Sequence, residues 1–224
     1  MGDKRVSLVK LEPLTRDDAE QVRVWRNEPE MQAVLRTAKR LTYDEQQEWY
    51  TNEIANRESH TRYWALTEYD ASAGYCDFKG YACEHLPDKR QLLGYGGIEH
   101  ISWENSNGEI SLLLDPNMYK QGLGIEAVAL FLDQAFNYLN LEAVYGECYM
   151  CGPWGFWTKQ VAKHGGMSAF LPLRKYYDGG YHSSYYFTFT KEAYGKLNMR
   201  DTSKGNEQAT TGEEYEAILR QGSC

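Results

Sequence analysis

The chain has 224 residues, of which 42% are hydrophobic, and a formal net charge of −8. This length buries one substantial core, so a single domain is expected. An acidic chain without clustered Lys and Arg is unsuited to nucleic acid or to an anionic membrane surface. There is no apolar run of about 18 residues and no charged-then-apolar leader, which predicts a cytoplasmic protein without a membrane span.

The first third of the chain contains one strand signal and two helix starts. Val6–Leu11 alternates like a strand. Thr15 is a typical N-cap for a helix that should end near Pro29, because proline disfavours helix at the preceding residue. Thr42, followed three residues later by a glutamate, predicts a second helix that runs to Ile54.

Two antiparallel strands are expected next, at 62–67 and 92–98. The segment between them, an insertion at 69–91, is longer than an ordinary hairpin loop. A second hairpin joins strands at 97–102 and 109–114, with the Asn107-Gly108 pair expected to supply the positive dihedrals of a tight turn.

A strand meets a helix in the middle of the chain. The apolar run Ile110–Leu114 stops at an Asp-Pro pair, and apolar residues then recur with helical spacing over Ile125–Leu139. Gly122 and Gly124 lie between the two elements. The free amides and the positive dipole end of a helix N-terminus attract anions, and glycine lets the backbone approach them. The sequence therefore predicts a phosphate-binding turn.

The last third continues the alternation of strands and helices. A strand at 143–149 should run parallel to 110–114 through a right-handed crossover, and a helix is expected from Pro153 to His164. A hairpin of strands 169–177 and 181–190 follows. The domain is expected to span 1–198, with a polar tail at 199–224 that contains a short helix near 213–220.

Five cysteines are present, an odd number with uneven spacing, which fits reduced thiols better than a disulfide framework. They are Cys76, Cys83, Cys148, Cys151 and Cys224. A zinc site built from Cys76, Cys83, His85 and the Cys148-x-x-Cys151 pair is an alternative, but its first spacing is wide. Free thiols and no metal are expected.

The central turn resembles the acetyl-CoA loop of the GNAT superfamily of N-acetyltransferases, especially the ribosomal-protein alanine acetyltransferases and the amino-sugar acetyltransferases. The matching residues are Leu112–Pro116 followed by Lys120–Ile125. Tyr119 departs from the pattern, because the family usually has arginine or glutamine there. The start of the chain matches too, through Leu11-x-Pro-Leu-Thr and Trp25–Pro29.

This resemblance implies an α/β fold with a mixed, mostly antiparallel sheet, a splayed parallel strand pair and flanking helices. It also implies acetyl-CoA as cosubstrate and direct transfer of the acetyl group to a primary amine. The loop amides would hold the pyrophosphate, the preceding strand would pair with the pantetheine arm, and a backbone N–H near Leu113 would serve the oxyanion. The implied cofactor-binding residues are Leu112, Leu113, Leu114, Lys120, Gln121, Gly122, Leu123, Gly124 and Ile125.

Three residues are candidates for the base. Glu147 occupies the position where the ribosomal-protein enzymes place a glutamate, and Glu109 the position where other members often carry one. His100 qualifies because imidazole titrates near neutrality. The family's asparagine and its acidic tyrosine are replaced by Gly152 and Lys159, so Lys159 becomes the candidate that stabilises the leaving thiolate. Each base candidate is as compatible with a structural role, and a lysine on a surface helix is more often only solvated. Proton loss to water without a dedicated base is a further alternative.

The predicted acceptor contacts are Trp25, Tyr43, Trp49, His100 and Tyr177, although core or rim packing would also explain the aromatic ones. The acceptor itself stays open among amino sugars, protein N-termini and small amines, and a homodimer is compatible with the sequence. The alternative function is a degenerate acyl-CoA-binding module. Release of thiol from acetyl-CoA would indicate the enzyme, whereas binding without turnover would indicate the module.

Overall fold

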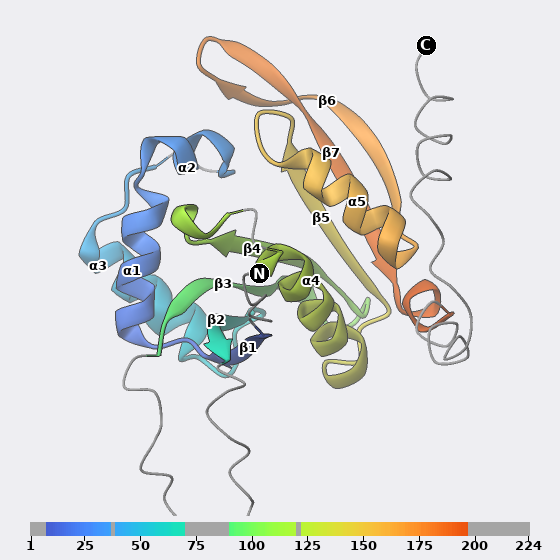
Figure 1. Ribbon diagram of the computed structural model, residues 1–224, viewed down its shortest axis with the longest axis horizontal. Helices are drawn as coiled ribbons and strands as arrows, with labels where there is room; N and C mark the ends of the chain where they lie inside the picture. Colours follow the sequence, from blue (N-terminus) through green and yellow to red (C-terminus); the bar gives the residue numbers. More distant parts are fainter. Residues whose placement is uncertain (1–7, 37–38, 70–89, 120–121, 197–224) are drawn as a thin grey trace, which may run out of the picture.

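The computed structural model describes residues 8–36, 39–69, 90–119 and 122–196. These residues form one seven-stranded sheet with the order β1-β2-β3-β4-β5-β7-β6 (Figure 1). Within this sheet β4 and β5 pair in parallel and the other neighbours pair antiparallel, which confirms the predicted fold class. The strands are β1 Leu8–Pro13, β2 Arg62–Tyr69, β3 Leu92–Ser102, β4 Asn107–Leu114, β5 Ala143–Tyr149, β6 Met167–Tyr177 and β7 Gly180–Thr190.

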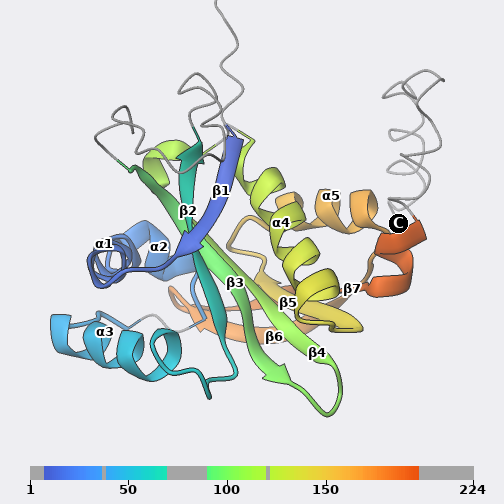
Figure 2. The same ribbon diagram turned by 90° about the horizontal axis from the view of Figure 1, so that it is seen from below.

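Helices cover both faces of the sheet (Figure 2). One face carries α1 Arg16–Arg26, α2 Pro29–Val34 and α3 Tyr43–Trp49, the last extended by a π-helical turn Tyr50–Ile54. The other face carries α4 Leu123–Asp133, extended by a π-helical turn Gln134–Tyr138, and α5 Trp154–His164. Each face has its own core, because strand residues alternate between them. The larger core lies under α4 and α5 and the smaller one under α1 to α3.

The predicted helix starts are confirmed by their caps. The Thr15 hydroxyl accepts a hydrogen bond from the amide of Asp18, and Thr42 does the same for Glu45, so both form capping boxes. The sequence reading missed α2. Pro29 ends α1, as expected, but it also occupies the first turn of a new helix, where its missing N–H costs nothing.

The turn between β3 and β4 differs from the prediction. Ser106 has the left-handed backbone, with φ 51°, whereas Asn107 and Gly108 already lie in β4. The predicted Asn-Gly turn is therefore wrong. Glycine is required at 108 for packing, since a Cβ there would come within 2.5 Å of Cγ2 of Ile98.

The two parallel strands separate after a short contact. β4 and β5 pair over three positions, the last being Glu109 with Tyr145. Beyond it β4 continues to Leu114 and β5 to Tyr149, with no further pair between them in the described residues. β5 instead pairs along its whole length with β7. The splayed strand pair is thus confirmed.

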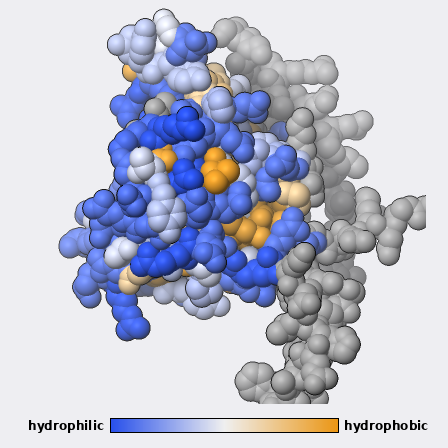
Figure 3. Space-filling model, turned by 90° about the vertical axis from the view of Figure 1, so that its left-hand side faces the viewer, coloured by the Kyte–Doolittle hydropathy of each residue, from blue (hydrophilic) through white to orange (hydrophobic). Residues whose placement is uncertain are grey.

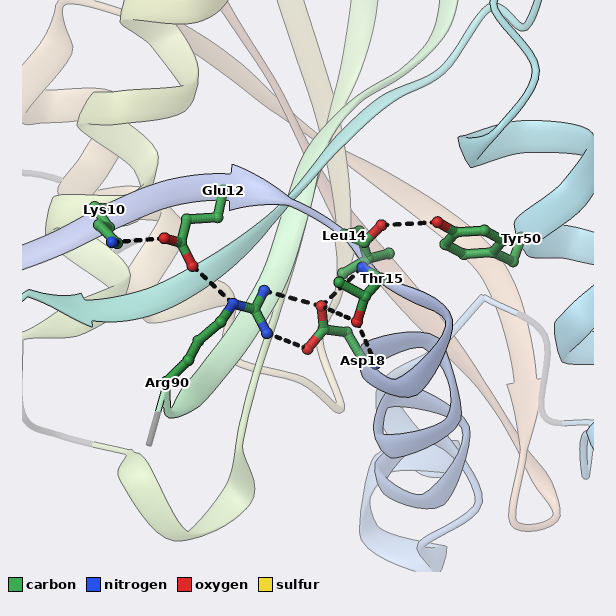
Figure 4. Close-up of polar contacts among 7 residues, drawn as sticks. All are labelled: Lys10, Glu12, Leu14, Thr15, Asp18, Tyr50 and Arg90. Atoms are coloured by element: carbon green, nitrogen blue, oxygen red, sulfur yellow. Dashed lines mark hydrogen bonds and ion pairs between the residues drawn. The ribbon is translucent and has the colours of Figure 1, made fainter. Parts of the chain in front are cut away.

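Arg90 fastens the start of β3 to two other elements (Figure 4). Its guanidinium bonds Asp18 of α1 through both terminal nitrogens, at 2.6 and 2.9 Å, and Glu12 of β1 through Nε at 2.7 Å. Most of the predicted insertion, residues 70–89, lies outside the described residues, as does the predicted tail. No described helix combines the length and apolar character needed to span a membrane.

Candidate active site

The N-terminus of α4 offers backbone amides to a ligand. Gly122 occupies the N-cap with φ 85°, and no side chain caps the helix there, so its first amides lack a partner within the helix. Leu123 is buried and anchors the turn in the core, while Ile125 is exposed. A Cβ on Gly124 would come within 3.2 Å of the Phe156 ring of α5. This geometry fits an anion-binding turn.

The end of β4 presents a backbone edge next to this turn. Leu113 is buried towards α1, whereas Leu112 and Leu114 pack towards α4. Because pairing with β5 stops at Glu109, no described strand covers the β5 side of these residues. An extended ligand arm can hydrogen-bond to such an edge as an added strand would. The other two predicted loop residues, Lys120 and Gln121, lie outside the described residues.

Glu109 lies at the point where the strands part, on the face that carries α1 to α3. Glu109 is 6% exposed, and its carboxylate forms an ion pair with Arg36. Its other oxygen lies 3.2 Å from Nδ1 of His100. A carboxylate only accepts hydrogen bonds, so in the neutral imidazole this contact places the proton on Nδ1 and the lone pair on Nε2. The imidazole is 60% exposed, and this lone pair is therefore available to a substrate.

The backbone of His100 is strained. Its φ is 52°, and the register between β3 and β4 shifts between Glu99 and Ser102. A left-handed conformation is uncommon outside glycine and is concentrated at functional sites. The bulge brings the imidazole to Glu109. The sequence named both residues but carried no signal for the bulge that pairs them.

Glu147 lies on the same face, two residues beyond the last β4–β5 pair. Nε of Arg174 donates to its carboxylate at 2.9 Å and the Ser184 hydroxyl at 2.7 Å. Burial raises the pKa of Glu147, but these hydrogen bonds act more strongly and leave it below its usual value. Glu147 therefore stays ionised and is a weak proton acceptor. Sequence reasoning missed Arg36, Arg174 and Ser184, because no motif contains them.

A pair of tyrosines lies between the two carboxylates. The rings of Tyr145 and Tyr186 stack with centroids 6.0 Å apart and an interplanar angle of 20°. Burial and then the charge of Glu109 raise the pKa of both phenols. Both hydroxyls are consequently protonated at neutral pH and can donate hydrogen bonds.

Lys175 joins β6 to the end of α2. It is 7% exposed, and its ammonium donates to the carbonyls of Ala33 and Leu35, both at 2.6 Å. Burial lowers the pKa of Lys175. The clamped segment leads directly into Arg36, the ion-pair partner of Glu109. The sequence gave no sign of this contact.

The predicted acceptor contacts are only partly brought together. Trp25 is 4% exposed and lies in the smaller core, so it packs rather than lines the site. Trp49 is half-buried, with its ring 5.9 Å from that of Tyr63. Tyr43 is exposed at the start of α3, and the ring of Tyr177 lies 5.1 Å from Nζ of Lys175.

Lys159, the predicted acid, is exposed on α5. That helix covers the face of the sheet opposite to Glu109 and Glu147 (Figure 2). The structure does not bring Lys159 to these carboxylates.

Metal binding has one candidate cluster in the described residues. Ligand atoms of Glu99, His100 and Glu109 lie within 4.8 Å of one another. However, Glu99 already accepts a hydrogen bond from Tyr63, and Glu109 is paired with Arg36. An ion would have to displace both.

The alternative zinc site lies partly outside the described residues, which do not include Cys76, Cys83 and His85. Cys148 and Cys151 are free thiols, and burial raises the pKa of Cys148 to about 12.

A family model described as an acetyltransferase (GNAT) domain matches residues 9–150, more than half of the chain. The chain therefore belongs to the GNAT acetyltransferases. It is an acetyl-CoA-dependent N-acetyltransferase, which moves the acetyl group to an amine. No curated protein matches the sequence significantly.

Solved structures share the fold. Spermidine N-acetyltransferase from Vibrio cholerae in complex with CoA and spermine is 16% identical, with TM-score 0.65, over 83% of this chain and 97% of that one. A chimera of the same enzyme with hSSAT is 17% identical, with TM-score 0.64, and the match covers 84% of this chain and 98% of that one. A dodecameric structure of the Vibrio cholerae enzyme in an intermediate state is 16% identical, with TM-score 0.59, and the match covers 83% of this chain and 95% of that one. At such identities the likeness concerns the fold alone.

Proposed function

We propose that the acetyl group is transferred where β4 and β5 part. Acetyl-CoA is held by the α4 turn and the free edge of β4, and the amine arrives from the face of α1 to α3. The outer surface on the side of α1 to α3 is mostly hydrophilic, with separate hydrophobic areas (Figure 3). Cofactor and acceptor then meet from opposite sides of the sheet, and this arrangement supports direct transfer.

His100 is the base in this proposal, and Glu109 orients it. The observation that carries this assignment is the contact between Nδ1 and the Glu109 carboxylate, beside the gap, with the rest of the ring exposed. Nε2 takes the proton of the amine while the nitrogen bonds to the acetyl carbon and the thiolate leaves. A buried carboxylate stabilises the imidazolium that forms. Glu147, the other carboxylate, is less suited because Arg174 stabilises its ionised form.

The acceptor is a primary amine on a small molecule or peptide. A small-molecule amine as the acceptor is supported by the fold that this chain shares with the spermidine N-acetyltransferases. The free thiols Cys148 and Cys151 support a reducing compartment such as the cytoplasm.

The test measures thiol release from acetyl-CoA over an amine library. His100→Asn, chosen because asparagine tolerates a left-handed backbone, should lower kcat by roughly 10²- to 10⁴-fold while acetyl-CoA still binds. His182→Asn on β7 serves as the matched control and should turn over normally. Wild-type protein that binds acetyl-CoA but acetylates no amine would overturn the proposed reaction, and unchanged kcat in His100→Asn would remove His100 as base.

A further inference from the structure

Two arginine–glutamate pairs flank the stacked tyrosines on the acceptor face. Arg36 pairs with Glu109 on β4, and Arg174 on β6 pairs with Glu147 on β5. Tyr145 pairs in register with Glu109, so the aromatic pair lies between the two ion pairs. The site is thus symmetrical in charge, with one guanidinium at each side.

Both arginines keep unused hydrogen-bond donors. In the described part of the chain Arg36 uses Nη2 and Arg174 uses Nε, and a guanidinium has five N–H groups. Their side chains are 48% and 50% exposed. They also act on each other: the bond to Glu147 raises the pKa of Arg174, and the charge of Arg36 opposes this. The positive charges of Arg36 and Arg174 are therefore close enough to repel each other.

The acidic groups of the same face are already satisfied. Glu109 has Arg36 and His100, Glu147 has Arg174 and Ser184, and Glu99 has the Tyr63 hydroxyl. To reach Glu109 or Glu147, a polycationic acceptor would have to compete with the arginine already paired there. An anionic group on the acceptor displaces nothing, because planar guanidinium donors match carboxylate and phosphate oxygens.

We propose, resting on the proposed function, that the acceptor is a primary amine that also carries a carboxylate or a phosphate, and that Arg36 and Arg174 bind this anion. The amine then projects towards His100. Arg174 is a specificity residue in this arrangement and takes no part in proton transfer.

The experiment compares four amines as acceptors: propylamine, β-alanine, O-phosphoethanolamine and spermidine. One of the two anionic amines should exceed propylamine and spermidine in kcat/KM by roughly ten- to hundredfold, the size of a charge-assisted hydrogen-bond pair. The β-alanine and O-phosphoethanolamine arms distinguish a carboxylate from a phosphate. A higher kcat/KM for spermidine, or equal kcat/KM values for all four amines, would contradict the anionic acceptor but not the proposed acetyltransferase reaction. Failure of all four, with no turnover in the wider library, would overturn both.

Variants of Arg174 and of Glu147 should change the preference for the anionic amine in opposite directions. Arg174→Gln should reduce the anionic preference, measured as the ratio of kcat/KM for the anionic amine to kcat/KM for propylamine, to near unity, and Arg174→Lys should restore part of it. Glu147→Gln frees the guanidinium and should increase the preference, so the proposal stays testable even if Arg174→Gln folds poorly. Arg57→Gln, in an exposed turn before β2, is the matched control. An unchanged preference in both Arg174→Gln and Glu147→Gln would contradict the assignment.

Discussion

Two glycines of the α4 turn perform different tasks. Gly122 needs its missing side chain for backbone conformation, since φ is 85° and a Cβ would meet nothing within 4 Å. Gly124 lies inside the helix, and its missing side chain leaves room beside Phe156. The sequence motif gave both positions but could not separate a conformational requirement from a spatial one.

Gly124→Val should abolish the thermal stabilisation that coenzyme A confers. A β-branched side chain at this position pushes against Phe156 and keeps the backbone away from the pyrophosphate. The shift in Tm at saturating coenzyme A measures the effect. Gly195→Val, in open space near the end of the described chain, should keep the full shift. If Gly124→Val were stabilised as much as wild type, the loop would not belong to the cofactor site.

The candidate catalytic residues show how far sequence reasoning reaches at this scale. Glu109, Glu147 and His100 were named because the family pattern or their chemistry points to them. Their partners Arg36, Arg174 and Lys175 come from distant segments, and no local pattern records such contacts. The partners nevertheless decide the roles, because Arg174 makes Glu147 a weak base.

At the scale of elements, α2 depends on β6 for its position. The helix has six residues, too few to be stable alone. The Lys175 ammonium satisfies the carbonyls at its C-terminal end, where cations are favoured. β6 therefore fixes one wall of the proposed acceptor site. The proline at the start of α2 was visible in the sequence, but the lysine that holds its end lies 142 residues further on.

Lys175→Met should weaken acceptor binding more than cofactor binding. Loss of the ammonium leaves the part-buried carbonyl of Leu35 without this donor and that of Ala33 with only the weak Cys151 thiol. An unsatisfied carbonyl costs about 1–3 kcal/mol, and the segment that carries Arg36 loosens. We expect KM for the amine to rise several-fold with KM for acetyl-CoA unchanged, together with a lower Tm. Lys196→Met removes an exposed lysine that pairs with Glu192 within the described residues, and it should change neither. Equal increases in both KM values would indicate general unfolding instead.

Arg90→Ala should destabilise the fold where three elements meet. Its removal leaves Asp18 buried without its cation, and breaking such a pair costs about 3–5 kcal/mol when burial is complete. Since Arg90 is itself partly exposed, we expect a loss of about 2 kcal/mol in urea unfolding. Arg57→Ala is the exposed control. A loss as small as that of the control would show that the contact in Figure 4 contributes little.

For the molecule as a whole, most of the architecture could be predicted from the sequence. The strands, the two capped helices and α5 follow from periodicity, caps and proline, which are local signals. The divergence of β4 and β5 came only from the family resemblance, because it depends on non-local pairing. The bulge at His100 and the turn at Ser106 were missed for the same reason: tertiary packing decides them.

Acid should lower the free energy of unfolding in two steps, and the first belongs to His164. This imidazole is buried in α5, and desolvation followed by the charge of Lys163 lowers its pKa from 6.5 to about 4. The unfolded chain therefore binds more protons between these values, so stability is full above pH 6.5 and is lost as pH falls towards 4. The loss is about 2 kcal/mol between pH 7.5 and pH 5, from a maximum of about 3 kcal/mol. Below this range the carboxylates of Asp18, Glu12 and Glu147, whose pKa values are lowered, add a second loss.

His164→Gln separates the first step from the second. Glutamine does not titrate, so urea unfolding of this variant should lose about 2 kcal/mol less than wild type on going from pH 7.5 to pH 5, whatever its stability at pH 7.5. His182→Gln, on the partly exposed β7 hairpin, should follow the wild-type curve. The sign of the change in the free energy of unfolding identifies the cause. A buried histidine that gained a carboxylate partner would make the protein more stable at pH 5 than at pH 7.5. Parallel curves for His164→Gln and wild type would show that His164 takes up its proton in the folded state and that the acid loss arises from the carboxylates alone.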